Sequence, residues 1–286
     1  MPSISSPVSV EFFPHDSVKE NRFDLLTTPK HAKAVQNQGK VYLVGAGTGD
    51  PELLTIKAYK AILKADVICY DNLVSDEILA INPTAEKIYV GKKCAKHSMP
   101  QQDINGLLVT LAKQGKIVIR LKSGDPFIFG RGGEEMQTVV SAGIACESIA
   151  GITTALAVAN SVNIPLTHRD YAQSVKFVTG FLKADTPNEQ YAELLADNQT
   201  VVFYMGLNTL PNLTQGLLQA GKSADTPFAI IANVSRHNEQ VLVGTLSTIQ
   251  ALQNDAKLPS PAVMIMGDVV SLYHQLNAPT LTYAAL

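Results

Sequence analysis

Short apolar runs alternate with longer amphipathic segments between residues 40 and 149. Each run is four or five residues long, and most contain two or more β-branched side chains, as buried strands do. The predicted strands cover residues 41–44, 67–70, 87–90, 117–121 and 145–149. Helices are predicted between them at residues 51–63, 104–112 and 134–142. Strands and helices that alternate in this way predict a mostly parallel α/β domain.

The first of these helices has a clear predicted start. Asp50 is a preferred N-cap residue, and Pro51 suits the first helical position. Apolar residues from Leu53 to Leu63 then recur at helical spacing. We therefore expect one continuous helix that begins at Pro51. Gly115 and Gly143 are the expected stops of the next two helices.

A second set of strands and helices follows a segment of small residues at 153–160. Its predicted strands cover residues 176–179, 200–204, 228–232, 240–245 and 262–266, and its helices cover 207–219 and 246–253. Two adjacent late strands predict a mixed sheet. We therefore expect two α/β domains, at residues 40–160 and 161–286, with the ligand cleft between them. Residues 1–39 are polar and aperiodic, which predicts a flexible N-terminal extension.

Composition narrows the classes of partner. The chain of 286 residues is 46% hydrophobic and 17% charged, as soluble globular proteins are. Its net charge of −2 favours neither nucleic acid nor a membrane surface, so an anionic substrate needs a local basic pocket. Three cysteines lack C-x-x-C spacing, and Cys69 lies in an apolar run. With no signal peptide and no apolar run near the ~20 residues of a membrane span, we expect a cytoplasmic protein.

The densest polar loop is at residues 120–135. It holds four glycines, three cationic and three acidic side chains between a predicted strand and helix. Glycines allow a ligand to approach the backbone closely, and the charges favour a polar ligand. Arg131, flanked by glycines, is a candidate for anion binding. Glu134 and Glu135 fall in the first turn of the helix, where the helix dipole favours acids.

The glycine-rich loop at residues 45–50 leaves two interpretations. A dinucleotide site would place Asp71 on a ribose, at the usual offset of about 20 residues. The fingerprint G-x-G-x-x-G, however, requires glycine where Asp50 stands. A tight turn that needs glycines explains the loop equally well, and NAD stays an alternative.

Polar residues follow other predicted strands as well. Asp71 suits a general base at the carboxyl end of a strand, or else a residue that caps a turn. The loop at 91–97 contains three lysines and a histidine, which suit a phosphate or carboxylate ligand or a solvated surface. His168 and Arg169 adjoin the expected domain junction, where a histidine is either functional or structural. Met205 either packs under a flat ring or belongs to the core.

Six segments, in this order, resemble those of the uroporphyrinogen-III C-methyltransferases. They are residues 41–55, 70–75, 120–135, 151–154, 164–169 and 204–206. The Gly-Asp-Pro-Phe run at 124–127 is shared by the wider tetrapyrrole methylase superfamily. The resemblance spans about residues 40–275 and implies a homodimer with S-adenosylmethionine as methyl donor, S-adenosylhomocysteine as product and no metal. The implied reaction adds two methyl groups to ring carbons of uroporphyrinogen III, giving precorrin-2 for siroheme- or cobalamin-type synthesis.

The resemblance also implies catalytic roles. Asp71 matches the proton acceptor and Lys92 the proton donor. Arg131 and Glu134 match residues that handle the macrocycle.

The substrate that the resemblance implies carries several carboxylates, so Arg131, His168 and Arg169, together with Lys92, suit local cations that bind it. The residues implied to bind the donor are Thr48, Ser123, Gly124, Asp125, Ile128, Thr153, Thr154, Met205 and Val234.

The chain departs from the family pattern at three positions. Thr48 stands where proline is common, Ser123 where glycine is common, and Asn72 where many members have arginine. The last change removes one contact to a substrate carboxylate. Besides NAD-dependent oxidation, two functions stay open: methylation of a later corrin intermediate, and tetrapyrrole transport without catalysis.

Overall fold

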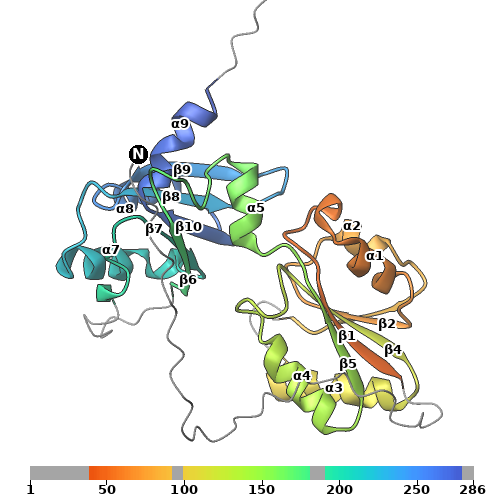
Figure 1. Cartoon of the computed structure of the whole chain (residues 1–286). Coiled ribbons are helices and arrows are strands. Elements are labelled where there is room, and N and C mark those ends of the chain that lie inside the picture. Colours follow the sequence, from red (N-terminus) through yellow and green to blue (C-terminus); the bar gives the residue numbers. More distant parts are fainter. Residues whose placement is uncertain (1–38, 92–98, 181–190, 279–286) are drawn as a thin grey trace, which may run out of the picture. The chain divides into compact units, whose positions relative to one another are not determined.

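The computed structural model describes residues 39–91, 99–180 and 191–278, and residues 37–286 form one compact unit. Two five-stranded sheets account for the described strands (Figure 1). The predicted boundary between residues 160 and 161 stays a prediction, as does the flexible extension at 1–39, which lies almost wholly outside the described residues.

The first sheet is entirely parallel. Its strands are β1 (Lys40–Gly45), β2 (Val67–Tyr70), β3 (Glu86–Tyr89), β4 (Ile117–Lys122) and β5 (Ala145–Ile149). They lie in the order β3-β2-β4-β1-β5. The predicted parallel α/β arrangement is therefore confirmed, and all five carboxyl ends meet at one edge of the sheet.

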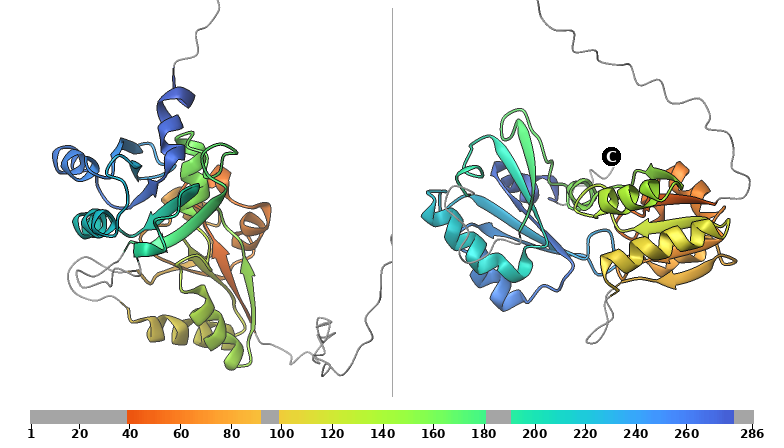
Figure 2. Two further views of the ribbon diagram at one scale, coloured as in Figure 1. Left: turned by 60° about the vertical axis from the view of Figure 1, so that its left-hand side comes forward. Right: turned by 90° about the horizontal axis from the view of Figure 1, so that it is seen from below.

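Helices cover both faces of this sheet (Figure 1). They are α1 (Ile56–Ile62), α2 (Asp76–Ala80), α3 (Gln101–Lys113) and α4 (Gly132–Ser141). Alternate strand residues such as Val44 and Ile68 pack with α1 and α2, while Leu43 and Val67 pack with α3 and α4. Helices α3 and α4 lie side by side (Figure 2). The β-strand period of two thus supplies a separate core on each face.

The predicted continuous helix from Pro51 is wrong. Asp50 caps only a 3-10 turn, η1 (Pro51–Leu53), by accepting the Glu52 N–H at 2.8 Å. Leu54 then adopts an extended conformation, and Thr55 caps α1 by accepting the Ala58 N–H at 3.1 Å. The chain breaks here because two capping residues, five positions apart, each start an element of their own. Helix α2, only five residues long, was not predicted.

The second sheet is mixed, as predicted. Its strands are β6 (Ser174–Thr179), β7 (Gln199–Tyr204), β8 (Pro227–Ala232), β9 (Gln240–Thr245) and β10 (Ala262–Met266). The order is β6-β7-β10-β8-β9, with β6 and β7 parallel and the other pairs antiparallel. Both predicted α/β halves are thus present.

Short helices complete this half. They are α5 (Thr154–Ser161), η2 (Leu207–Thr209), α7 (Leu210–Gln219), α8 (Ile249–Ala256), η3 (Asp268–Leu272) and α9 (Tyr273–Leu276). Helices α7 and α8 contribute Leu213, Leu217 and Ile249 to the core on one face of the sheet. Helix α5 contributes Val158 to the other face. Among the described residues, no helix is long and apolar enough to cross a membrane.

The predicted buried thiol of Cys69 is confirmed, since this side chain is completely buried. Burial raises the pKa of Cys69 to about 12 and that of the half-buried Cys146 to about 11. Both groups are therefore protonated at pH 8, where only the thiolate would react.

We expect iodoacetamide at pH 8 to spare Cys69 and Cys146 in the folded protein and to modify both in denaturant, as measured by peptide mass spectrometry. Rapid modification of Cys69 in the folded protein would contradict this burial.

Candidate functional site

A pocket of about 440 Å³ is formed by loops that follow strands of both sheets. Five of the nine residues predicted to bind the donor line it. They are Thr48 after β1, Ser123 after β4, Thr154 at the start of α5, Met205 after β7 and Val234 after β8. Loops that are distant in sequence therefore converge on one concave surface of the size that binds a small molecule.

The other four predicted donor residues do not line this pocket, although two of them directly follow or precede residues that do. The four are Gly124, Asp125, Ile128 and Thr153. Asp125 acts within its own loop, because its two carboxylate oxygens accept the N–H groups of Phe127 at 2.9 Å and Gly151 at 3.1 Å. Thr153 shares a hydrogen bond of 2.8 Å with the Tyr204 hydroxyl. Thr153 therefore contacts a residue of the pocket wall, whereas Asp125 ties its own loop to Gly151.

Glycines allow the loops of the first half to touch backbone to backbone. Gly47 and Gly124 exchange two hydrogen bonds of 3.2 and 2.6 Å, and both have positive φ angles, of 65° and 68°. A Cβ on Gly45 would lie 2.7 Å from the Gly124 carbonyl oxygen, and one on Gly151 would lie 2.6 Å from the Gly45 Cα. Side chains are excluded at these positions because the backbones themselves fill the space. The tight-turn interpretation of residues 45–50 thus accounts for their glycines.

Met205 lies on the pocket wall and not in the core. It has a φ angle of 57° and remains 57% exposed. Such a conformation is uncommon for a bulky residue and is retained only where surrounding structure imposes it. The core interpretation of Met205 is therefore wrong.

Tyr204 joins the second sheet to helix α5. Its hydroxyl accepts the Ala155 N–H at 3.0 Å and contacts Thr153. Burial raises the pKa of Tyr204, so the phenol stays protonated and neutral.

A second cavity, of about 670 Å³, contains Asp71. Its walls come from residues 49–51, 70–72, 74–77 and 235–237 together with Tyr89. Arg236 lines both cavities and donates from Nη2 to the Leu73 carbonyl at 3.0 Å. This arginine was not predicted, although it follows the carboxyl end of β8 as Asp71 follows β2.

The carboxylate of Asp71 is held at both oxygens. Oδ1 accepts the Leu73 N–H at 3.1 Å, and Oδ2 lies 3.4 Å from Nη2 of Arg120. The side chain remains 28% exposed at the cavity. An oriented, partly exposed carboxylate of this kind suits a proton acceptor.

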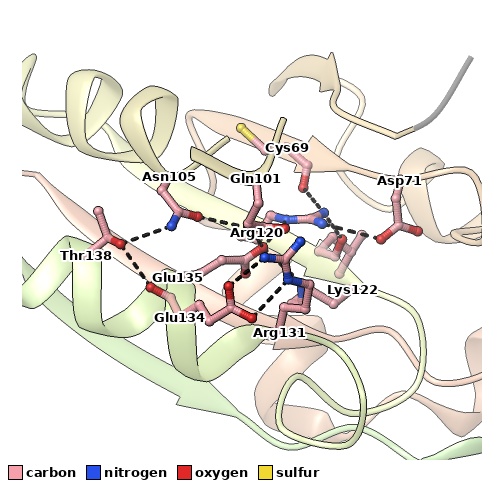
Figure 3. Close-up of polar contacts among 11 residues, drawn as sticks. Cys69, Asp71, Gln101, Asn105, Arg120, Lys122, Arg131, Glu134, Glu135 and Thr138 are labelled. Carbon is pink, nitrogen blue, oxygen red and sulfur yellow. Dashed lines mark hydrogen bonds and ion pairs between the residues drawn. The ribbon is translucent and has the colours of Figure 1, made fainter. Parts of the chain in front are cut away.

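Behind Asp71 lies a buried group of charges formed by Arg120, Lys122 and Glu135 (Figure 3). Arg120 and Lys122 are two positions apart on β4 and therefore point to the same face of the sheet. The helix dipole alone does not account for Glu135, because this side chain is completely buried and pairs with both cations. A sequence signal did exist: two cations alternate within an otherwise apolar strand.

Arg131 and Glu134 form an exposed ion pair at the start of α4. Arg131 precedes the helix with a φ angle of 59°, and its guanidinium donates to both Glu134 oxygens, at 2.9 and 2.6 Å. The hydrogen bond lowers the pKa of Glu134 and raises that of Arg131, so both stay charged at neutral pH.

The remaining predicted residues lie elsewhere. His168 accepts the Asp170 N–H at 3.1 Å and packs edge-on against Tyr171. Neither His168 nor Arg169 lines the two cavities described above. Lys92, with the rest of the basic loop up to residue 98, lies outside the described residues. Among the described residues, no group of three or more metal-ligating side chains occurs.

Together, the fold and the site define a class of α/β enzyme in which loops at the strand ends of two sheets enclose a small-molecule pocket. A family model described as Tetrapyrrole (Corrin/Porphyrin) Methylases matches residues 40–250. The chain therefore belongs to the tetrapyrrole methylases, and the resemblance noted in the sequence is confirmed. Because this family transfers methyl groups, its match argues against the alternative that the protein is an NAD-dependent oxidoreductase.

Relatives of known description agree with this assignment. A siroheme synthase from Psychrobacter cryohalolentis is 54% identical over 250 residues, covering 87% of this chain and 48% of that protein. One from Thiobacillus denitrificans is 47% identical over 274 residues, covering 96% of this chain and 57% of that protein. The chain thus spans about half the length of the curated relatives it matches.

Solved structures resemble the whole fold. A uroporphyrin-III C-methyltransferase from Thermus thermophilus has a TM-score of 0.72 and 38% identity, with 84% of this chain and 99% of that chain covered. A structure of the Thermus enzyme complexed with S-adenosyl homocysteine has a TM-score of 0.70 and 37% identity, with coverages of 82% and 100%. A cobalt precorrin-4 methyltransferase has a TM-score of 0.70 and 26% identity, with coverages of 81% and 95%.

Proposed function

We propose that the protein transfers methyl groups from S-adenosylmethionine to two ring carbons of uroporphyrinogen III, giving precorrin-2. The observation that carries this proposal is the pocket in which Thr48, Ser123, Thr154, Met205 and Val234 come together. These positions were expected to bind the donor from the motif resemblance alone. The likeness to the Thermus enzyme over nearly its whole length further supports the choice of substrate.

The pocket fits an adenosyl ligand in two respects. Much of its lining is apolar, from residues such as Met205, Val234 and Val263, which suits the face of a purine ring. In addition, Oγ1 of Thr48 is buried without a hydrogen-bond partner among the described residues. A buried polar group without a partner is costly, so a ligand that satisfies it gains affinity. When bound, S-adenosylmethionine supplies an electrophilic methyl group on a sulfonium.

This fit yields a prediction for Thr48. Thr48→Val keeps the shape of the side chain but removes the hydroxyl, so a hydrogen bond worth about 1 kcal/mol to the ligand is lost. We expect the Kd for S-adenosylhomocysteine, measured by calorimetry, to rise about fivefold, while the Tm of the free protein stays equal or rises. An unchanged Kd would show that Thr48 does not contact the ligand.

Asp71 is proposed to accept the proton that leaves the methylated ring carbon. Its carboxylate is oriented by Leu73 and Arg120 and faces the second cavity, where we place the substrate. The exposed Arg131 is proposed to exchange its contact with Glu134 for a substrate carboxylate, since guanidinium groups bind carboxylates in a two-pronged geometry. Lys92 as proton donor remains a proposal from the resemblance. His168 and Arg169 as contacts to substrate carboxylates remain proposals from their charge and their place near the expected domain junction.

The wider setting is part of the same proposal. We infer that the protein acts as a cytoplasmic homodimer and that its product feeds siroheme- or cobalamin-type tetrapyrrole synthesis. The siroheme synthases that it resembles support a place in siroheme synthesis.

The decisive experiment is an anaerobic incubation with S-adenosylmethionine and freshly made uroporphyrinogen III, followed by mass spectrometry. A gain of two methyl groups on the tetrapyrrole is the expected result. If the protein binds S-adenosylhomocysteine but leaves uroporphyrinogen III unchanged, later corrin intermediates are tested next as substrates. That alternative is favoured by the likeness to the cobalt precorrin-4 methyltransferase.

A further inference from the structure

We propose that Arg120 and Glu135 are positioning residues that hold Asp71 in the orientation it needs as proton acceptor. This inference rests on the proposed function and adds two buried residues to its mechanism. Neither residue lines either cavity that we describe, so both would act through Asp71.

The guanidinium of Arg120 is fixed on three sides. Nε donates to Oε1 of Glu135 at 3.2 Å, Nη1 donates to the Leu121 carbonyl at 2.9 Å, and Nη2 lies 3.4 Å from Oδ2 of Asp71 (Figure 3). The group is planar and rigid, so contacts at two corners determine where the third points. Arg120 is only 4% exposed, and solvent does not compete for these contacts.

The sheet places this guanidinium behind Asp71. Strands β2 and β4 are neighbours, and Arg120 is paired in register with Cys69, two residues before Asp71. Asp71 is therefore held by Leu73 on one oxygen and by Arg120 on the other. These two contacts define both the direction and the charge environment of the carboxylate.

Glu135 determines how strongly Arg120 pulls on Asp71. Oε1 of Glu135 accepts from Arg120, from Lys122 at 3.0 Å and from Gln101 at 3.0 Å, while Oε2 has no partner among the described residues. The four charges of Asp71, Arg120, Lys122 and Glu135 sum to zero. Burial, assisted by Arg120, lowers the pKa of Lys122, and Glu135 opposes this shift.

Stability alone does not explain such an arrangement. Buried ion pairs are often replaced by apolar side chains without loss of stability, since desolvation offsets their attraction. Here the chain of contacts starts at a fully buried carboxylate on α4 and ends at a carboxylate that is 28% exposed at a cavity. An arrangement that leads from the interior to one accessible group is suited to orienting that group.

The substitution Glu135→Gln tests this role. Glutamine keeps the size of the side chain but removes its charge, so Arg120 retains Asp71 as its main counter-charge and pairs with it more tightly. The carboxylate then accepts a proton less readily. We expect kcat to fall about 10- to 100-fold, while KM and the Kd for S-adenosylhomocysteine change less than twofold.

A double-mutant cycle separates positioning from a structural role. In the Asp71→Asn background, Glu135→Gln is expected to lower kcat by less than twofold, because its effect passes through Asp71. A structural role would instead give the same loss in both backgrounds, and that result would overturn the proposal. So would an unchanged kcat in Glu135→Gln alone.

Further variants keep the test decisive. If Glu135→Gln fails to fold, Arg120→Lys replaces it in the cycle, since lysine keeps the charge but lacks the planar fork. Glu193→Gln is the matched control: Glu193 forms an exposed pair with Lys176 at 2.7 Å in the second half, and its kcat should match the wild type. If the wild type methylates only a later corrin, the proposed substrate is wrong and the same cycle is measured on that corrin.

Discussion

Asp71→Ala is expected to lower kcat by about 100-fold or more while leaving the protein folded, because a positioned proton acceptor contributes on that order to catalysis. The side chain is 28% exposed at a cavity, and among the described residues its polar partners are Arg120 and the Leu73 N–H, so we expect its loss to leave the core packing intact. Turnover is measured by mass spectrometry of the methylated tetrapyrrole. Folding is monitored by thermal unfolding, and donor binding by calorimetry with S-adenosylhomocysteine.

The control for this variant lies at the opposite edge of the same sheet. Glu86 forms an exposed ion pair with Lys116 at 3.0 Å, and exposed pairs contribute only about 0–1 kcal/mol to stability. Glu86→Ala should therefore keep wild-type kcat. Wild-type turnover in Asp71→Ala would remove Asp71 from the reaction, whereas loss of both turnover and donor binding would indicate a collapsed site.

Gly45→Ala is expected to abolish donor binding and to destabilise the fold by about 3 kcal/mol, as overpacking of a close backbone contact does. The added Cβ would overlap the backbone of Gly151 and lie 2.7 Å from the Gly124 carbonyl oxygen. Backbone atoms at a strand end cannot move aside as a flexible side chain can. The loops bearing Thr48, Ser123 and Thr154 would therefore separate, and urea unfolding with calorimetry measures both losses.

Gly106→Ala is the matched control. Gly106 lies inside α3, and a Cβ there would meet no atom within 4 Å. The same substitution should stabilise the protein by about 0.5–1 kcal/mol, because alanine loses less conformational freedom in a helix. Equal destabilisation by both substitutions would contradict the proposed backbone contact at Gly45.

Much of the fold follows from local patterns. Every described strand was predicted within about two residues. Central strands such as β4 and β8 are buried on both faces, which leaves a run of apolar β-branched side chains that is easily recognised. The helix at Pro51 was misplaced, since Thr55 is as good a cap as Asp50 and the pattern does not choose between them. Helix α5 was described only as a segment of small residues, because its alanines favour a helix whereas its threonine and valine favour a strand.

The candidate site was predicted in part, for a similar reason. Parallel strands place their carboxyl ends at one edge, so a polar residue directly after such a strand, as Asp71 is, was expected to face a ligand. The residues expected to bind the donor came instead from the resemblance to a known family. Five of the predicted donor residues then line one pocket. His168 and Arg169 were chosen from their place near a domain junction, and sequence position there does not determine which way the loop turns.

The arrangement of buried charges depends on contacts between distant segments. Arg120 and Asp71 are 49 positions apart, and they meet only because β4 lies beside β2 in the order β3-β2-β4-β1-β5. Periodicity along the chain reveals which side chains share a face, since that depends on neighbouring residues alone. It does not reveal which strand is adjacent, because strand order results from packing the whole sheet with its helices. The sequence therefore identifies the loops and their chemistry, whereas the folded sheet alone brings Arg120 and Glu135 behind Asp71.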